Sequence, residues 1–346
     1  MIAEKKLLTV VIPTYNRPRQ LLATLEKLLP QITNETEVMV LDNCSDTILK
    51  TYISDNMGVD RISNLTFIRH PVNIGPDANF AEAFRLSNGE FTWVLGDDDD
   101  VADNAVTLII KELSKFNKDE IIGINFYTNC CQVARDTAIV ISSISDIAHK
   151  LDFFGNWFFI SASVYNTEEY LKHIRFAYWG AYSMASQIIP AVVAISQGKK
   201  FILSEKYTVT NLKATEEEQW SHVQVSLTLP ELLELPIYYT EKEFLAIGEK
   251  LSVQFVSYPH AFFCMLRSLK MNPLLIDRYH IFLLRQLHAK TFTFKKNKVK
   301  QYLTYQAILF LAKNRKLTDM ILKSSSRIRN RIDRSNYVKF KLFERK

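Results

Sequence analysis

The chain has 346 residues, of which 47% are hydrophobic and 23% are charged. This composition excludes an intrinsically disordered protein and predicts one domain of about 200 residues with a smaller appendage. No stretch approaches the roughly 20 apolar residues of a membrane-spanning helix, and the N-terminal apolar run lacks a signal-peptide cleavage site. The four cysteines match neither a zinc site nor a disulfide framework, so we expect a protein of the reducing cytoplasm.

The net charge of +6 divides unevenly along the chain. Residues 290–346 contain 17 lysines and arginines against three acids, a net charge of +14. The residues before 290 therefore carry 26 basic and 34 acidic side chains, a net charge of −8. A basic tail on an acidic body predicts an anionic partner for the tail, which is a lipid headgroup, a phosphorylated substrate or a nucleic acid.

Short apolar runs alternate with helical patterns over the first 130 residues. The runs predict strands at 7–12, 38–41, 65–68, 91–95 and 121–127, and the patterns between them predict helices at 19–29, 78–86 and 105–116. This alternation predicts an α/β fold, with a Rossmann-like, mostly parallel sheet flanked by helices.

Polar clusters follow four of the predicted strands, at residues 14–17, 42–43, 73–79 and 97–100. Ligands of parallel sheets bind outside the carboxyl ends of the strands, so the clusters predict one binding site. The last cluster is four consecutive aspartates, whose mutual repulsion calls for a cation. Mg²⁺ is commonly held by one or two carboxylates plus substrate phosphates. The alternative is a solvated acidic turn in which Asp100 or Asp103 caps the next helix.

The remainder of the chain divides into two parts. Residues 131–215 are less regular and rich in aromatic side chains, whereas the pattern after 215 is mostly helical, at 239–258, 276–289 and 299–312. We therefore expect a catalytic domain at 1–215 and a basic helical extension at 216–346, which serves membrane association, oligomerisation or acceptor binding.

Several motifs occur in a characteristic order: VVIPTYNR at 10–17, VLDNCSD at 40–46, NIG at 73–75, and GEF at 89–91 leading to the aspartates. In this respect the chain resembles the family 2 glycosyltransferases of GT-A fold. Four segments are similar to abequosyltransferase-like enzymes of O-antigen and capsule synthesis. They are LGDDD at 95–99, the Asn79-Phe80 pair, FFIS at 158–161 and WGAY at 179–182. The resemblance covers about residues 7–212.

The resemblance implies a nucleotide diphosphate sugar as donor and Mg²⁺ or Mn²⁺ as cofactor, held by a DxD motif. It assigns the base of the nucleotide to Asp42, and the metal to Asp97 and Asp99. The other positions that it places around the donor are Pro13, Thr14, Tyr15, Arg17, Asn43, Asn73, Gly75, Asn79 and Asp98.

The catalytic base is a departure from the family. Inverting members often carry a Glu-Asp pair after the DxD motif, but residues 178–183 contain no carboxylate. Asp152, Glu168 and Glu169 are the nearest upstream acids, each with the alternative of a surface or capping role, and Asp152 and Glu168 are the candidates for the base. A retaining enzyme needs no such base, so the stereochemistry stays open.

Three aromatic residues and one histidine are weaker candidates. Trp157, Trp179 and Tyr182 are expected to stack on an acceptor sugar, with the hydrophobic core as the alternative. His222 is expected to contact the metal or a phosphate, with a solvated loop position as the alternative.

The basic tail interleaves lysines and arginines with large apolar residues, as around 308–311 and 338–343. This pattern predicts contact between residues 290–346 and an anionic membrane, with a solvated helical face or a subunit contact as the alternatives. The resemblance implies a lipid-linked glycan acceptor, which fits a position at the inner face of the membrane. Two other functions stay open. A sugar-phosphate nucleotidyltransferase would carry a glycine-rich loop where residues 14–17 have none. A non-catalytic module that binds nucleotides or anionic surfaces leaves the four clusters unexplained, and the acidic body argues against nucleic acid as the partner.

Overall fold

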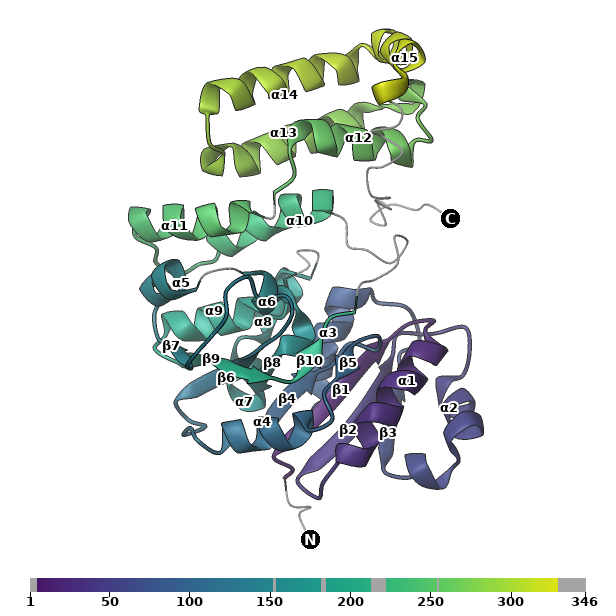
Figure 1. Ribbon diagram of the computed structural model, residues 1–346, viewed down its shortest axis with the longest axis vertical. Helices are drawn as coiled ribbons and strands as arrows, with labels where there is room; N and C mark the ends of the chain where they lie inside the picture. Colours follow the sequence, from purple (N-terminus) through teal and green to yellow (C-terminus); the bar gives the residue numbers. More distant parts are fainter. Residues whose placement is uncertain (1–4, 152–153, 182–184, 213–221, 254, 329–346) are drawn as a thin grey trace. The chain divides into compact units, whose positions relative to one another are not determined.

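The computed structural model describes residues 5–151, 154–181, 185–212, 222–253 and 255–328, without the side chains of residues 222 and 224. The chain forms two compact units (Figure 1), one of residues 1–212 with 235–243 and the other of residues 213–234 with 244–346. Each unit has its own hydrophobic core.

An eight-stranded sheet in the order β3-β2-β1-β4-β8-β6-β9-β7 forms the centre of the first unit. Its strands are β1 (Leu8–Thr14), β2 (Thr36–Asp42), β3 (Leu65–Arg69), β4 (Phe91–Val94), β6 (Ile121–Tyr127), β7 (Ile139–Ile141), β8 (Ser163–Asn166) and β9 (Lys200–Tyr207). A separate antiparallel pair consists of β5 (Asp100–Val101) and β10 (Val209–Thr210).

The strands β3, β2, β1 and β4 run parallel, and β6 runs parallel to β9. The strand β8 lies antiparallel to both β4 and β6, and β7 is antiparallel to β9. The predicted mostly parallel sheet is therefore confirmed, and the strands predicted in the first 130 residues are present within two residues at every boundary. The antiparallel strands come from the part of the chain whose pattern was irregular.

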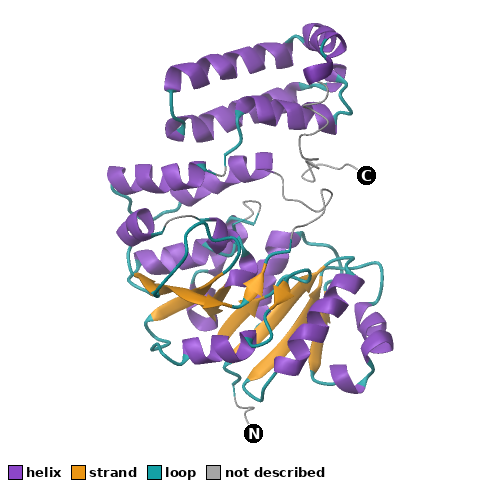
Figure 2. Ribbon diagram, in the orientation of Figure 1, coloured by secondary structure: helices purple, strands orange, loops and turns teal. Residues whose placement is uncertain are grey.

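Helices cover both faces of this sheet (Figure 2). They are α1 (Pro18–Leu28), α2 (Leu49–Met57), α3 (Pro76–Leu86), α4 (Ala105–Leu113), α5 (Ile144–Lys150), α6 (Gly155–Phe158), α7 (Thr167–Lys172), α8 (Ile174–Trp179) and α9 (Ile189–Ser196). In α1 the leucines at 21, 25 and 28 recur at helical spacing and are fully buried against the sheet. Each such leucine contributes about 1.5–3 kcal/mol relative to an exposed one.

The second unit is helical, as predicted. Its helices are α10 (His222–Thr228), α11 (Glu241–Ser252, which begins in the first unit), α12 (Tyr258–Ser268), α13 (Arg278–Thr291), α14 (Lys298–Lys313) and α15 (Arg315–Ser324). Short 3₁₀ turns in the chain lie at Leu29–Gln31, Asp60–Ile62, Ile160–Ala162, Leu229–Leu233, Pro273–Leu275 and Phe292–Phe294. None of the helices in the described residues is long and apolar enough to cross a membrane.

Candidate active site

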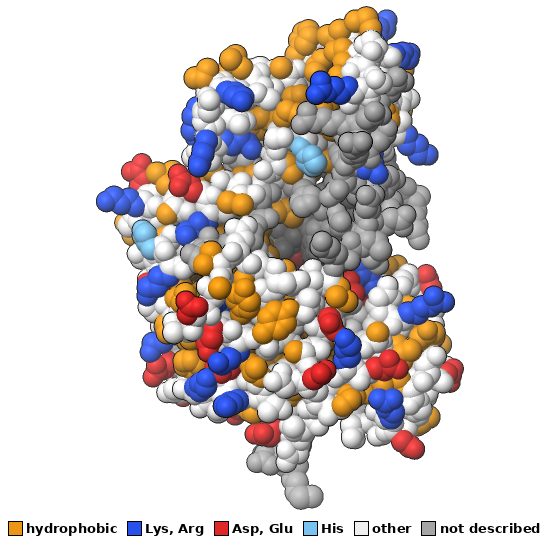
Figure 3. All heavy atoms as spheres, viewed as in Figure 1, with side chains coloured by type: hydrophobic (Ala, Val, Ile, Leu, Met, Phe, Trp, Pro, Cys, Tyr) orange, Lys and Arg blue, Asp and Glu red, His pale blue; other side chains and the backbone are white. Residues whose placement is uncertain are grey.

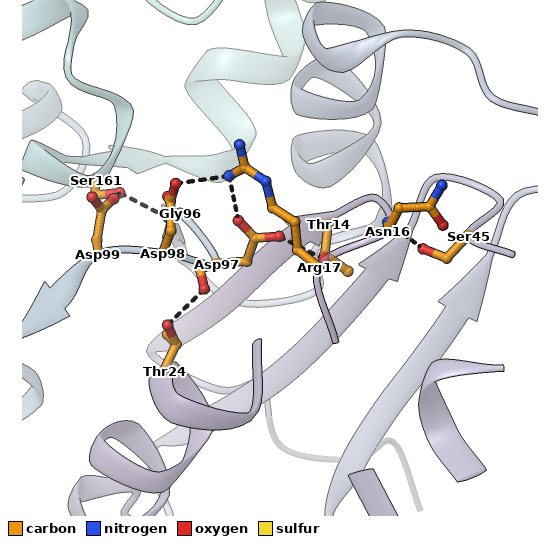
Figure 4. A network of polar contacts seen from close by, with 10 residues as sticks. All are labelled: Thr14, Asn16, Arg17, Thr24, Ser45, Gly96, Asp97, Asp98, Asp99 and Ser161. Carbon is orange, nitrogen blue, oxygen red and sulfur yellow. Dashed lines mark hydrogen bonds and ion pairs between the residues drawn. The ribbon is translucent and has the colours of Figure 1, made fainter. Parts of the chain in front are cut away.

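The carboxyl ends of β1, β2 and β4 meet at one edge of the sheet. Thr14, the last residue of β1, pairs with Asp42, the last residue of β2. The backbone NH of Leu95, just after β4, donates to the carbonyl of Val11 at 2.9 Å, which brings the following aspartates beside β1. Residues 96–99, which we name the aspartate turn, lie at this edge together with Arg17 (Figure 4).

Asp97 points toward the loop after β1. Its carboxylate accepts a hydrogen bond from the Thr14 hydroxyl at 2.6 Å and one from the Arg17 guanidinium at 3.1 Å, and its carbonyl accepts one from the Thr24 hydroxyl at 2.9 Å. Burial raises the pKa of Asp97 to about 6, despite the opposing effects of Arg17 and Thr14. The fold therefore spends stability to keep this carboxyl inside the site.

Asp99 is held from another segment, residues 160–162. The Ser161 hydroxyl donates to the Asp99 carboxylate at 2.5 Å and accepts the backbone NH of Gly96 at 2.8 Å. Burial raises the pKa of Asp99 to about 7, although the Ser161 hydrogen bond lowers it. A side chain at Gly96 would place its Cβ 2.4 Å from the Asp99 carboxylate, so only glycine leaves room for this arrangement.

The two outer aspartates have different partners. Asp98 is partly exposed and receives the Arg17 guanidinium at 2.7 Å, so that Arg17 bridges Asp97 and Asp98. Asp100 follows the turn as the first residue of β5 and forms an ion pair with Lys27. The tertiary contacts thus separate Asp100 from the three aspartates of the turn.

The donor set of the aspartate turn fits a hard divalent cation. Carboxylate oxygens are the ligands of Mg²⁺ and Mn²⁺, and two carboxyls with raised pKa values gain from a cation that replaces their protons. Within the described part of the chain, no three His, Cys, Asp or Glu side chains are grouped to hold a metal by themselves. The residues therefore fit an ion that is shared with substrate phosphates, where Asp97 and Asp99 would supply the protein ligands.

The predicted amide residues brace the edge of the site. Asn43 is buried, donates to the side chain of Asn73 at 3.0 Å and to the carbonyl of Gly75 at 3.2 Å, and accepts the backbone NH of Ile74 at 2.9 Å. Gly75 has φ +85°, a conformation that L side chains rarely adopt. Asn43 and Asn73 thus fix the loop between β3 and α3 to the end of β2.

Asn79 and Asp42 are also engaged within the protein. Asn79 is buried, and its side chain contacts the His70 ring at 3.0 Å. The Asp42 carboxylate accepts the backbone NH of Ser45 at 2.8 Å and the Arg69 guanidinium at 3.3 Å. These contacts hold the loop after β2 in place for any ligand.

The loop after β1 is joined to the loop after β2. Asn16 has φ +55°, its backbone NH donates to the Ser45 hydroxyl at 2.9 Å, and its side chain makes reciprocal hydrogen bonds with Asp46. Pro13 is buried in β1 beyond the last residue that pairs with β4, and Tyr15 is exposed at the edge. The structure therefore exposes an aromatic residue directly after Thr14, whose hydroxyl donates to Asp97.

Several predicted site residues lie elsewhere. Trp157 is buried, donates to the Tyr165 hydroxyl at 3.0 Å and stacks on Phe201, so its position is that of a core residue and gives no support to an acceptor role. Trp179, by contrast, is exposed at the end of α8.

Glu168 lies at the opposite edge of the sheet from the aspartate turn. Because β8 is antiparallel to β4, its last residue Asn166 pairs with Phe91, the first residue of β4. Glu168 follows in α7 with an exposed side chain near Lys172, and this placement gives no support to a role as catalytic base. The candidates Asp152 and Tyr182 lie outside the described residues, as does the side chain of His222.

The sequence analysis assigned no individual role to three residues that shape the site: Thr24, Ser161 and Asn16. Thr24 and Ser161 are ordinary polar residues in a helix and a short turn, and no spacing rule links them to the aspartates. The signal for Ser161 was its place in the FFIS segment that resembles the family. Asn16 occupies a position between a strand and a helix where asparagine tolerates a positive φ.

The mostly parallel sheet with a carboxylate site at its strand ends defines a GT-A fold, to which solved structures are similar. S. aureus TarS residues 1–349 in complex with UDP has a TM-score of 0.57 and 17% identity, covering 93% of this chain and 92% of that one. The mannosyltransferase PcManGT from Pyrobaculum calidifontis in complex with GDP-Man and Mn²⁺ has a TM-score of 0.52 and 14% identity, covering 97% and 85%.

The sequence profile described as "Glycosyl transferase family 2" matches residues 9–174, which contain the whole aspartate turn. The abequosyltransferase RfbV of Salmonella typhimurium is 32% identical over 115 residues, which are 30% of this chain and 31% of that protein. The matched segments span about a third of the curated relatives, between 30% and 37% of their length. Residues 9–174 of the chain are therefore similar to the family 2 glycosyltransferases.

Proposed function

We propose that the protein transfers a sugar from a nucleotide diphosphate sugar to a glycan acceptor. The observation that carries this proposal is the aspartate turn, where two buried carboxyls with raised pKa values stand beside Arg17 at the carboxyl ends of β1 and β4. Structures of similar fold were solved with UDP and with GDP-Man and Mn²⁺, which supports a nucleotide donor here.

The donor would bind across the ends of β1 and β2. The Arg17 guanidinium brings a positive charge to the turn, where a diphosphate would meet it. The exposed ring of Tyr15 offers a face for stacking to the base, and Asp42 is the proposed acceptor of a hydrogen bond from the base. The braced loops of Asn43, Asn73 and Asn79 would position these groups, because their amides already bind the backbone and one another.

Asp97 and Asp99 would hold Mg²⁺ or Mn²⁺ in this proposal. Such an ion, when bound, supplies Lewis-acid stabilisation of the charge on the departing nucleoside diphosphate. The protein's own contribution is to keep the two carboxyls in place: Ser161 and Gly96 orient Asp99, and Thr14 orients Asp97. Because these hydrogen bonds exist before the donor binds, the carboxyls of Asp97 and Asp99 are already oriented when the donor arrives.

The acceptor belongs to the proposal as well. Trp179 exposes an indole ring, which suits the apolar face of a pyranose. The basic extension supports an acceptor that is linked to lipid at the inner face of the cell membrane, with the enzyme peripheral to it. A relative named as an abequosyltransferase supports a cell-surface polysaccharide as the product.

A sugar-phosphate nucleotidyltransferase is the rival function. It would need free backbone NH groups in the loop after β1 to bind a triphosphate. The backbone NH of Asn16 donates instead to Ser45, and the loop contains no glycine. This loop is therefore built to join two strand ends rather than to surround phosphates.

Calorimetric titration with the diphosphates of uridine, guanosine, cytidine and thymidine, each with Mn²⁺ and with chelator, tests the proposal. We expect Mn²⁺-dependent binding of one diphosphate, lost in Asp99→Asn. The matched control is Asp100→Asn, an aspartate one position along that pairs with Lys27 outside the turn, and it should bind like the wild type. If no diphosphate binds under any metal condition, the proposed function is wrong.

A further inference from the structure

The helix α14 exposes an apolar stripe on the side that faces away from its own unit. Val299, Leu303 and Phe310 are 72%, 61% and 57% exposed. At about 100° per residue they lie within about 40° of one another around the helix. Ile308 and Ala312 lie on the opposite side of the helix, where they are buried in the helical core.

The burial of residues on α14 corrects the expectation of which residues contact a membrane. The basic and apolar pattern around 308–311 predicted membrane contact there, but Ile308 and Leu309 pack into the core of the second unit. The apolar residues that α14 exposes are instead Val299, Leu303 and Phe310, which leave apolar surface in contact with solvent. Exposed apolar patches of this kind mark a contact with a partner or with lipid.

The surroundings of the stripe are basic. From residue 278 to residue 328 the sequence has 12 lysines and arginines and a single acid, Asp319, which pairs with Lys323. Lys300 and Lys313 are exposed on α14 itself. Met320 on α15 and Phe282 on α13 add exposed apolar side chains. In Figure 3 hydrophobic and basic side chains are interspersed over these helices.

We propose that α14 lies flat on an anionic lipid surface, with Val299, Leu303 and Phe310 inserted at the boundary of headgroups and acyl chains. An apolar stripe flanked by lysines is the arrangement by which helices bind an anionic interface. A nucleic acid would pair with the charges but leave the stripe in water, whereas anionic lipid satisfies both. The inference deepens the proposed function, because it brings the enzyme to the surface where a lipid-linked acceptor lies.

Co-sedimentation of the full chain with vesicles tests this inference. Vesicles of phosphatidylglycerol and phosphatidylethanolamine should bind the protein, and vesicles of phosphatidylcholine should bind it at least about tenfold less, because neutral lipid gives no electrostatic attraction. The variant Val299→Ser/Leu303→Ser/Phe310→Ser should lose at least about tenfold in binding to the anionic vesicles without any change in charge.

The matched control is Ile48→Ser/Val59→Ser, two residues of the first unit that are 65% and 69% exposed. It removes a similar apolar surface from outside the stripe and should bind vesicles like the wild type. All these side chains are exposed, so the variants should fold, and thermal unfolding of each variant confirms that.

Three results with the variants would overturn the inference, as would a wild-type protein that does not bind the anionic vesicles. One is equal binding by the stripe variant and the wild type. Another is equal loss in the Ile48/Val59 control. The last is a dimer, seen by light scattering without lipid, that the stripe variant dissociates while vesicle binding persists. Diphosphate binding, measured on the same preparations, separates the two proposals: a protein that binds a diphosphate but no vesicles refutes only the membrane contact, and the reverse refutes only the proposed function.

Discussion

Replacement of Asp99 by asparagine should stabilise the protein at alkaline pH. Burial raises the pKa of Asp99 to about 7, from 3.8 in an unfolded chain. The native state therefore holds this proton more tightly than the unfolded state does. The resulting contribution to the stability of the native state is fully present below pH 3.8. It is lost as the pH rises through 7, where the buried carboxylate must ionise. Asparagine has no such charge and still offers an oxygen to Ser161.

The size of the effect follows from the shift. A difference of about three pKa units corresponds to about 4 kcal/mol at pH 8, and to less than about 1 kcal/mol at pH 4. For a unit of this size, about 4 kcal/mol raises the unfolding temperature by roughly 8–15 °C. A site whose native residue is less stable than its neutral isostere is what selection for a metal-binding function produces.

Thermal unfolding of Asp99→Asn and of the wild type, in chelator at pH 4 and pH 8, measures this difference. Asp100→Asn is the control, because Asp100 is partly exposed and paired with Lys27, and its loss should change stability by no more than about 1 kcal/mol at either pH. Equal unfolding temperatures for Asp99→Asn and the wild type at pH 8 would refute the reasoning. So would a stabilisation of the same size at pH 4, since that would have nothing to do with ionisation.

Three further predictions concern the aspartate turn. Gly96→Ala should weaken Mn²⁺-dependent diphosphate binding at least about tenfold, because the new Cβ displaces the Asp99 carboxylate; unchanged calorimetric affinity would contradict it. Arg17→Ala should tighten the binding of Mn²⁺ in the absence of nucleotide, because the guanidinium no longer neutralises Asp97 and Asp98. Weaker Mn²⁺ binding, measured by calorimetry, would show that Arg17 does not occupy the place of a cation. In the wild type, affinity for Mn²⁺ and diphosphate should fall up to about tenfold per pH unit below pH 7, because Asp99 takes up a proton there. The fall should become steeper below pH 6, where Asp97 is protonated as well. An affinity that stays constant from pH 8 to pH 5.5 would exclude both residues as ligands.

Much of the first unit is determined by local patterns. The run at 8–14 is apolar and β-branched, and it is buried throughout as β1. The leucines of α1 recur at helical spacing and form its buried face. Alternation of such segments predicts parallel strands, and parallel strands bring their carboxyl ends to one edge. The location of the aspartates beside the loop after β1 was therefore predictable without any tertiary contact.

The direction of β8, and with it the position of Glu168, was decided only by the tertiary structure. The sequence places this residue within about 75 positions of the aspartates, but the antiparallel pairing of β8 with β4 sends it to the opposite edge. The same holds for Ser161, which reaches Asp99 from 62 positions away. Strand direction and contacts at such separations depend on how whole elements pack, and neither leaves a periodic signal.

Burial separates residues that the sequence presents alike. Trp157 and Trp179 both stand in aromatic segments, yet one stacks on Phe201 in the core and the other faces solvent. Along α14, Leu309 and Phe310 are neighbours in an apolar run, and only the packing of α12 and α13 against one side of the helix decides which of them is covered. Hydrophobicity indicates that burial of a side chain away from water is favourable in free energy. Which partner covers it, and which side chains stay exposed, is settled by the shape of the surrounding elements.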